Sequence, residues 1–336
     1  MRRTELLRFI ARRLFQLAIV LLVVTFFTFM LVKLLPGNPI ETIIPFGKGP
    51  QFAKQRALLS RDLGLNKSFF GQYWSYLTGV LQGHLGHQYS SGLPVSTLIN
   101  QSLPVSLQLM IYAQVISLVV AIPLGVLAAY RAGTKTDSAI NTSSFALLAL
   151  PNFVLALFLS FVVGAKLHWL PTAGYAPGWL DPIFNSSAHM QLGQHFQDMI
   201  LPAITLAVGQ IAVYMRLLRS DMIATLQENF ITLAKAKGIT NRRILWRHAL
   251  RPSSLTMLTV AGLNVGTLIG GAIVVEVIFD IPGMGEKIYQ AVVSRSYVEL
   301  QSYVLVIAVH FVLVNFAVDL LYTVLDPRIR RARTSV

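Results

Sequence analysis

Six long apolar stretches divide the chain, and each is long enough to form a membrane-spanning helix. Such a helix needs roughly 20 mainly apolar residues, because the hydrocarbon layer of a bilayer is about 30 Å thick. The stretches cover residues 14–32, 104–129, 139–164, 199–218, 253–278 and 303–324. The pattern predicts an all-α membrane protein with six transmembrane helices, the last five forming a core domain over residues 104–324. Pro123, Pro151 and Pro202 fall inside stretches, where a helix bundle tolerates kinks.

The composition supports this class. Of the 336 residues, 54% are hydrophobic and only 12% are charged. The charged residues crowd between the apolar stretches, as expected when an ionised side chain costs several kcal/mol at the bilayer centre. The net charge of +14 does not indicate a nucleic-acid binder, because the basic residues flank membrane-length segments instead of forming one solvated surface. The absence of cysteine excludes disulfides and thiolate chemistry.

The distribution of Lys and Arg predicts the orientation. Roughly two thirds of them lie in residues 1–13, the second loop, the loop at 219–252 with its flank, and residues 325–336. Both termini and the 219–252 loop are therefore expected in the cytoplasm. The first stretch, 14–32, is too long for a signal peptide and lacks a cleavage site, so we interpret it as a retained helix. Residues 33–103 form a long external loop, and its amphipathic stretches Phe52 to Leu63 and Phe69 to Leu81 predict a small cap.

The segment from Leu226 to Pro252, here called the basic segment, is the part most suited to contact another protein. It carries six of the chain's 28 Lys and Arg residues. Leu226, Phe230, Leu233 and Ala234 recur at helical spacing, and Gly238 follows where a helix C-cap falls. The pattern predicts two short helices joined at Gly238.

The sequence contains no recognisable catalytic motif. There is no Gly-x-x-x-x-Gly-Lys-Ser/Thr phosphate loop, no His-Glu-x-x-His and no Gly-x-Ser-x-Gly. His84 and His87 lie close together but lack supporting carboxylates, so a polar surface is favoured over a metal site. We expect no enzymatic activity and no cofactor bound by this chain.

Polar and small residues inside the last two stretches are candidates for a transport path. Asn264 lies near Gly266, Gly270 and Gly271, and small residues allow either close helix packing or a wider lumen. Both interpretations of this group stay open. For Asp319 a structural role is favoured, in which it pairs with an Arg on the inner side.

Several motifs together resemble one family. They are Leu34-Leu35-Pro36-Gly37-Asn38-Pro39, Gly83-His84-Leu85-Gly86, Ile122-Pro123-Leu124-Gly125-Val126, Ala234-Lys235-Ala236-Lys237-Gly238 with Arg242-Arg243-Ile244-Leu245, Val275-Glu276-Val277-Ile278-Phe279, and Leu325-Asp326-Pro327-Arg328. This set is similar to membrane subunits of ABC importers, in the branch for oligopeptides, dipeptides and nickel, and most like the dipeptide permease B type.

The resemblance implies a type I ABC importer fold in which the basic segment is the cytoplasmic coupling helix between the fourth and fifth spans. It assigns ATPase coupling to Phe230, Leu233, Ala234, Lys237, Gly238, Arg242 and Arg243. The translocation path falls to Asn264, Gly266, Gly270 and Gly271, and structural polar roles fall to Asp319, Asp326 and Arg328.

The resemblance also implies partners and a place in the cell. The partners are a second, homologous permease subunit, two cytoplasmic ATPase subunits or one fused ATPase that use ATP and Mg²⁺, an external substrate-binding protein and membrane lipid, with no nucleic acid. The location is the bacterial plasma (inner) membrane. Short peptides are the expected substrate, with nickel or haem as alternatives. A secondary transporter would need inverted repeats and buried coupling carboxylates, and a membrane-embedded enzyme would need a polar constellation.

Overall fold

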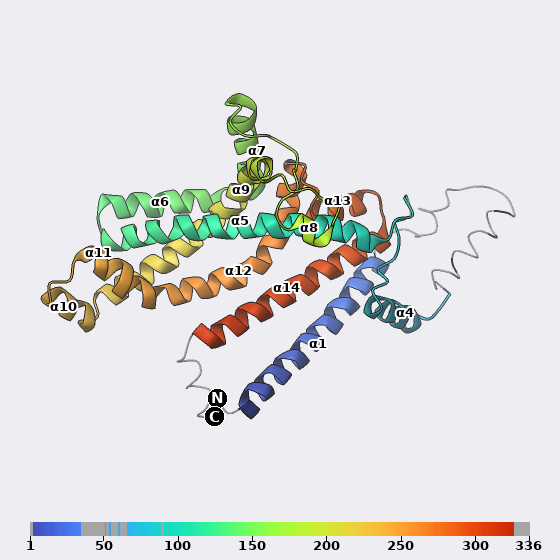
Figure 1. Ribbon diagram of the computed structural model, residues 1–336, viewed down its shortest axis with the longest axis horizontal. Coiled ribbons are helices and arrows are strands. Elements are labelled where there is room, and N and C mark those ends of the chain that lie inside the picture. Colours follow the sequence, from blue (N-terminus) through green and yellow to red (C-terminus); the bar gives the residue numbers. More distant parts are fainter. Residues whose placement is uncertain are drawn as a thin grey trace. The chain divides into compact units, whose positions relative to one another are not determined.

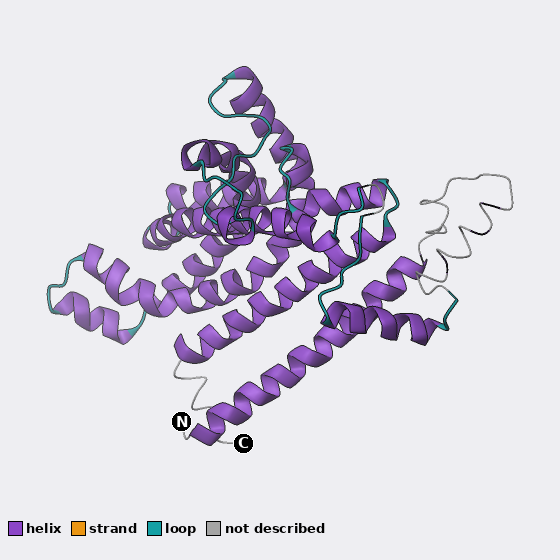
Figure 2. Ribbon diagram, turned by 45° about the vertical axis from the view of Figure 1, so that its right-hand side comes forward, coloured by secondary structure: helices purple, strands orange, loops and turns teal. Residues whose placement is uncertain are grey.

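The computed structural model describes residues 3–34, 51, 54, 60, 66–88 and 91–325. Within these ranges the regular elements are helices joined by loops (Figure 2). The chain forms two compact units: residues 1–104 with 282–316, and residues 105–281 with 317–336. The expected all-α class is confirmed in the described ranges.

The first unit contains α1 (Arg3–Leu34), α4 (Phe69–Leu81), the start of α5, α13 (Met284–Val293) and most of α14 (Tyr297–Leu325). The helix predicted at Phe69 to Leu81 is confirmed as α4, and the Ser68 hydroxyl caps it by accepting the Gly71 N–H. Helix α4 lies beside the C-terminal part of α1 (Figure 1). Aromatic rings join the two helices, because Phe26 and Phe29 contact Phe69 and Tyr73 edge to face or tilted. The predicted stretch Phe52 to Leu63 falls almost wholly outside the described residues.

A carboxylate ties the segment after α4 to α14 in the same unit. Glu299 in the first turn of α14 accepts hydrogen bonds from Gln88 Nε2 at 3.1 Å and from the Ser296 hydroxyl. One turn later, the Ser302 hydroxyl donates to the Leu85 carbonyl at 2.7 Å. The carboxylate is buried, and these hydrogen bonds offset part of the cost of removing it from water.

The second unit is built around α9 (Leu192–Leu226). This helix packs against α6 (Lys135–Ala149), α7 (Asn152–Leu159) and α12 (Leu250–Ile278). Tyr214, Met215, Leu218 and Met222 of α9 are fully buried in one apolar cluster. The body of α5 (Val95–Tyr130) joins this cluster, and a Cβ added at Gly125 would lie 3.0 Å from the Leu218 side chain. The helices approach closely because Gly125 has no side chain.

The apolar stretches form helices, but two of the predicted spans are bent or broken instead of being single straight helices. Three helices are long and apolar enough to cross a membrane alone: Val95–Tyr130, Leu192–Leu226 and Tyr297–Val318. Two bent pairs pass the same test together: Lys135–Ala149 with Asn152–Lys166, and Asn241–Leu268 with Gly270–Ile278. In α1, Phe15–Met30 is a shorter apolar helix. The described residues thus offer three to five spans by this criterion, and the count of six stays a prediction.

The stretch at 139–164 is not one continuous helix. Its two parts, α6 and the helix formed by α7 with η1 (Ser160–Lys166), meet at a bend of 98°. Leu150 adopts an extended conformation (φ −80°, ψ 121°) directly before Pro151. A residue before proline is pushed out of the helical region by the proline ring, and this position becomes a break instead of a kink.

Candidate functional site

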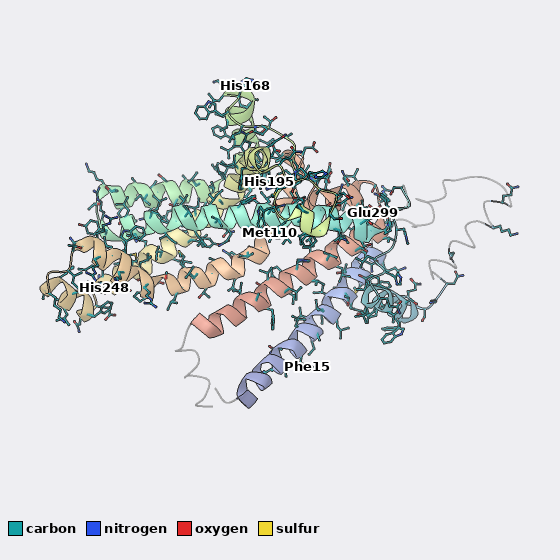
Figure 3. All side chains as sticks on the ribbon, viewed as in Figure 1. Phe15, Met110, His168, His195, His248 and Glu299 are labelled. Atoms are coloured by element: carbon teal, nitrogen blue, oxygen red, sulfur yellow. The ribbon has the colours of Figure 1, made fainter. Side chains whose placement is uncertain are left out.

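The basic segment folds into two short helical pieces on the end of the second unit. They are α10 (Asn229–Ala236) and α11 (Asn241–Arg243), the latter continuing into η2 (Ile244–Ala249) and α12. Figure 1 shows α10 and α11 at one end of α9 and α12. His248, labelled in Figure 3, marks the second piece. The prediction of two short helices in this segment is confirmed.

One side of α10 is part of the apolar core. Ile231 is 0% exposed and Ala234 is 7% exposed, and both join the cluster that holds Tyr214, Leu218 and Met222 of α9. In η2, Ile244, Leu245 and Ala249 are buried in the same cluster. The segment is therefore fixed to α9 by apolar packing on both pieces.

The other side of α10 is left open. Phe230 is 47% exposed and Leu233 is 56% exposed. The sequence placed Phe230, Leu233 and Ala234 on one stripe, but the structure divides them between two sides of the helix. Ala234 packs inward, so its small size serves the contact with the core of its own chain. Phe230 and Leu233 are free to meet a partner.

Gly238 ends α10 in a Schellman motif. The Ile239 N–H donates to the Ala234 carbonyl at 3.2 Å, and the Gly238 N–H donates to the Lys235 carbonyl at 2.9 Å. Gly238 has φ +73°, a left-handed conformation that residues with a Cβ adopt at a cost. A Cβ added there would meet nothing within 4 Å, so the constraint at Gly238 is conformational. The predicted C-cap is confirmed.

The remaining basic residues of the site point to solvent. Lys237, Arg242 and Arg243 are exposed, as is Trp246 between them and α12. They surround the two helical pieces with positive charge. Among the described residues, no carboxylate forms an ion pair with these three cations, in contrast to Arg219, which pairs with Asp137.

Polar contacts brace the base of the segment. Asp137 at the start of α6 forms a two-pronged ion pair with Arg219 of α9, with Nε–Oδ1 and Nη2–Oδ2 distances of 2.6 Å each. The Gly133 N–H and the Asn141 amide also donate to this carboxylate. The Ser253 hydroxyl donates to Thr225 Oγ1 at 2.8 Å and joins α12 to α9. Three helices therefore hold their ends together where the basic segment leaves the bundle.

The residues expected along a translocation path take different positions. The Asn264 amide of α12 donates to Gln210 Oε1 of α9 at 2.9 Å, so it makes a hydrogen bond between helices. Gly266 is buried. Gly270 faces open space, whereas a Cβ on Gly271 would contact Asn152 and Leu206 at 3.8 Å. Asn264 thus has a partner on α9, Gly271 is in ordinary van der Waals range of its neighbours, and Gly270 borders open space. The role of these residues in a translocation path stays a prediction.

Three residues given structural roles cannot be placed. Asp326 and Arg328 lie outside the described residues. Asp319 lies on α14, but its side chain is not among those described. Their assigned roles remain predictions.

A second polar site lies at the opposite end of the unit, and the sequence analysis missed it. The Asp181 carboxylate is buried, and its Oδ2 accepts hydrogen bonds from the Tyr175 hydroxyl at 2.6 Å, the Gly178 N–H at 2.7 Å and Gln108 Nε2 at 2.9 Å. Gln108 belongs to α5 and lies about 30 Å along that helix from Ala129, which packs near the basic segment. The two sites are thus separated by about one membrane thickness.

His195 extends this second polar site, which is here called the loop anchor (Figure 3). His195 of α9 is fully buried, with Nδ1 2.7 Å from the Ala176 carbonyl and Nε2 3.0 Å from the Tyr112 hydroxyl. Because a carbonyl only accepts, Nδ1 carries a hydrogen. Trp179 Nε1 donates to the Tyr112 oxygen at 2.8 Å, and the Asp198 carboxylate accepts the Ala176 N–H at 2.9 Å. The loop between η1 and α8 (Asp181–Phe184) is therefore fastened to both α5 and α9.

The only signals for the loop anchor in the sequence were single polar residues. Gln108 stands inside an otherwise apolar stretch, and His195 and Asp198 precede another. A buried polar side chain requires a partner, but nothing in the spacing identified residues 175–181 as that partner.

We expect Gly178→Ala to loosen the loop anchor. An added Cβ would lie 2.1 Å from Gln108 Oε1 and 2.5 Å from His195 Cε1, so both side chains must move. Such overpacking costs about 1–3 kcal/mol, and thermal unfolding of the detergent-solubilised protein should show a lower midpoint. Gly193→Ala is the matched control, because its Cβ would meet nothing within 4 Å. Equal midpoints for both variants would contradict the close approach.

Comparisons with known proteins agree on one family. Residues 121–331 match the model of the binding-protein-dependent transport system inner membrane component, and residues 6–110 match the model of the N-terminal part of such membrane components. The chain is 34% identical over 323 residues to a probable peptide ABC transporter permease protein of Sinorhizobium fredii, covering 96% of this chain and 99% of that one.

Other relatives carry two kinds of name. A putative peptide transport system permease protein of Brucella abortus is 33% identical over 327 residues, covering 96% of this chain and 98% of the relative. A nickel import system permease protein of Staphylococcus aureus is 33% identical over 318 residues, covering 95% and 90%.

One solved structure has a similar fold. The inward-facing MetNI methionine ABC transporter aligns with a TM-score of 0.54 at 15% identity, over 68% of this chain and 96% of that chain. At this identity the likeness shows the fold alone, and it supports the importer permease architecture.

Proposed function

Because this chain belongs to the family of binding-protein-dependent transport system inner membrane components, we propose that it is a pore-forming subunit of an ATP-driven importer of short peptides. As an integral inner membrane subunit of this family, it has no ATPase site of its own. The other components of the transporter complex are its partners: a second, homologous permease subunit, cytoplasmic ATPase subunits, either separate or fused, and an external substrate-binding protein.

The observation that carries the proposal is the construction of the basic segment. Phe230 and Leu233 lie exposed on a helix whose opposite side, through Ile231 and Ala234, is part of the core around α9. Helices that insert an apolar side into a groove are a common mode of protein recognition. A force on Phe230 and Leu233 would reach α9 and α12 directly, because the inward side of α10 packs on the same cluster.

The proposed mechanism is alternating access. ATP binding would bring two ATPase subunits together and move the two docked segments with them. Because the docked segments pack on α9 and α12, these helices would tilt with them. The population of the complex would then shift from inward-facing to outward-facing states, so that an external binding protein can deliver its cargo. In the proposed orientation both chain termini and the basic segment are cytoplasmic, and the loop anchor faces the outside.

Peptide is proposed as the substrate on the basis of the relatives. The two relatives named for peptide transport match over 99% and 98% of their own lengths, whereas the one named for nickel import matches over 90% of its length. Nickel is the second candidate, because the nickel-named relative is 33% identical to this chain, against 34% and 33% for the two peptide-named relatives. Haem is the third candidate.

Leu233→Asp should weaken binding of the ATPase. Leu233 is 56% exposed, so a carboxylate there does not disturb the core, but it would be desolvated in an apolar groove. Loss of a central contact of this kind costs about 2 kcal/mol, or roughly thirtyfold in affinity. The measurement is the amount of ATPase that co-purifies with the tagged chain. Thr232→Asp is the control, because Thr232 is exposed on another side of α10. Normal co-purification with Leu233→Asp would refute docking through this side.

Gly238→Val should uncouple ATP hydrolysis from transport. A β-branched residue at φ +73° is strained, so the Schellman motif would open and α10 would lose its fixed direction. In proteoliposomes, we expect ATP hydrolysis to persist while substrate uptake falls, with normal membrane insertion. Gly238→Asn is the matched control, because Asn tolerates this conformation. If both variants transport like the unchanged protein, Gly238 has no role in coupling.

The substrate can be identified from the partner. The complex should be purified with its external binding protein, and the ligand released from that protein should be analysed by mass spectrometry. We expect short peptides of varied sequence. Recovery of nickel without peptide would replace the peptide assignment and leave the importer assignment intact.

A further inference from the structure

The helix α4 has two apolar sides and one polar side. Phe69, Tyr73, Tyr76 and Val80 follow one another at helical spacing, and the first three have ring contacts with α1. Phe70, Trp74, Leu77 and Leu81 form a second stripe at the same spacing. In this second stripe, here called the outer stripe, Phe70 is 74% exposed, Trp74 65% and Leu81 79%, and Leu77 is half-buried.

The third side of α4 is polar. It contains Gln72, Ser75 and Thr78, and the Lys67 ammonium donates to the Ser75 hydroxyl at 2.7 Å. The helix itself contains no charged residue. Three separate sides over 13 residues are the pattern of a helix that lies at a membrane surface, between protein, lipid and water.

The point at which α4 contacts α1 indicates how deep α4 would lie in a membrane. The Tyr73 hydroxyl lies 3.0 Å from Thr25 Oγ1 and donates to the Leu22 carbonyl at 3.3 Å. Thr25 precedes Lys33, the charged residue near this end of α1, by eight residues, which corresponds to about 12 Å of helix. Half of the hydrocarbon layer is about 15 Å thick. With α1 inserted and Lys33 at the headgroups, the contact between α4 and α1 would therefore lie within the hydrocarbon layer.

The exposed surface of α1 continues this apolar environment. Phe15, Leu22 and Phe27 are each at least half exposed and belong to the shorter apolar helix of α1. The outer stripe is apolar and uncharged, and it is attached to a helix that itself exposes apolar side chains. Such a surface is suited to contact the acyl chains of lipids. Trp74 is of the residue type enriched at the boundary between headgroups and hydrocarbon.

We propose that α4 lies in the membrane, with the outer stripe buried in the acyl chains of the leaflet at the C-terminal end of α1 and the polar side turned to the headgroups. The loop after α1 would thus be in part a membrane-seated helix, not wholly a water-exposed cap. The proposal requires membrane insertion of α1, and it goes beyond the proposed function because it depends on neither the substrate nor the ATPase. In the proposed orientation this is the outer leaflet.

The absence of cysteine makes a direct test simple, because a single introduced Cys carries the only label. The full-length chain, alone and with its co-purified partners, would be reconstituted into vesicles of phosphatidylethanolamine and phosphatidylglycerol. A nitroxide label would be attached to Leu81→Cys or to Phe70→Cys. Collision with oxygen, which concentrates in lipid, would be compared with collision with water-soluble nickel ethylenediaminediacetate.

The neighbouring residues Leu81 and Gln82 provide a matched pair, since both are exposed but lie on different sides of the helix axis. We expect the ratio of oxygen to nickel collisions to be several-fold higher at Leu81 and Phe70 than at Gln82. A high nickel collision rate at Leu81 and Phe70 would show that the stripe faces water and would overturn the proposal. Low collision with both reagents would show that protein covers the stripe and would also overturn it. Two label sites protect the result against misfolding of one variant.

Discussion

The burial of one side of α10 against α9 is the contact on which the proposed coupling role of the basic segment depends. Ile231 and Ala234 occupy the same apolar cluster as Tyr214, Leu218 and Met222. Without that contact the basic segment would be a mobile loop, and a pull on Phe230 or Leu233 would not reach the membrane helices. Close-packed interiors transmit displacement because they have few voids and low compressibility. The ion pair of Asp137 with Arg219 adds a third helix, α6, to the same rigid end.

The two ends of the second unit use different chemistry to hold their helices. At the basic segment the contacts are mostly apolar, with the ion pair at the edge. At the loop anchor they are hydrogen bonds among buried groups, where Asp181 and His195 each fasten the same loop to α5 or α9. A polar network that is fully paired fixes one geometry, because any slip leaves a buried group without its partner. The loop is thus held in one position relative to both helices.

Much of the fold was predictable from the sequence, because the spacing of apolar residues specifies helices and glycine marks where a helix ends. The helix at Phe69 to Leu81 and the C-cap at Gly238 were found from helical spacing and from the conformational freedom of glycine. The break before Pro151 was underestimated as a kink, since hydropathy averages over the position where the proline ring acts. The inward direction of Ala234 was missed because Leu226, Phe230 and Ala234 share a spacing that does not reveal which side meets the core. The loop anchor depends in part on contacts between residues 73 and 83 positions apart, Gln108 with Asp181 and Tyr112 with His195, which spacing cannot show.

The Schellman motif at Gly238 has a thermodynamic consequence for any partner. Its two backbone hydrogen bonds complete the end of α10 within the isolated chain, and Ile231 holds the helix in place. A segment that folds only on binding loses about 2–5 kcal/mol of its interaction energy to ordering. Here the ordering has already taken place when the chain folds. In the proposed docking the surface is therefore preorganised, so the contact energy of Phe230 and Leu233 would be available for affinity instead of being used to form the helix.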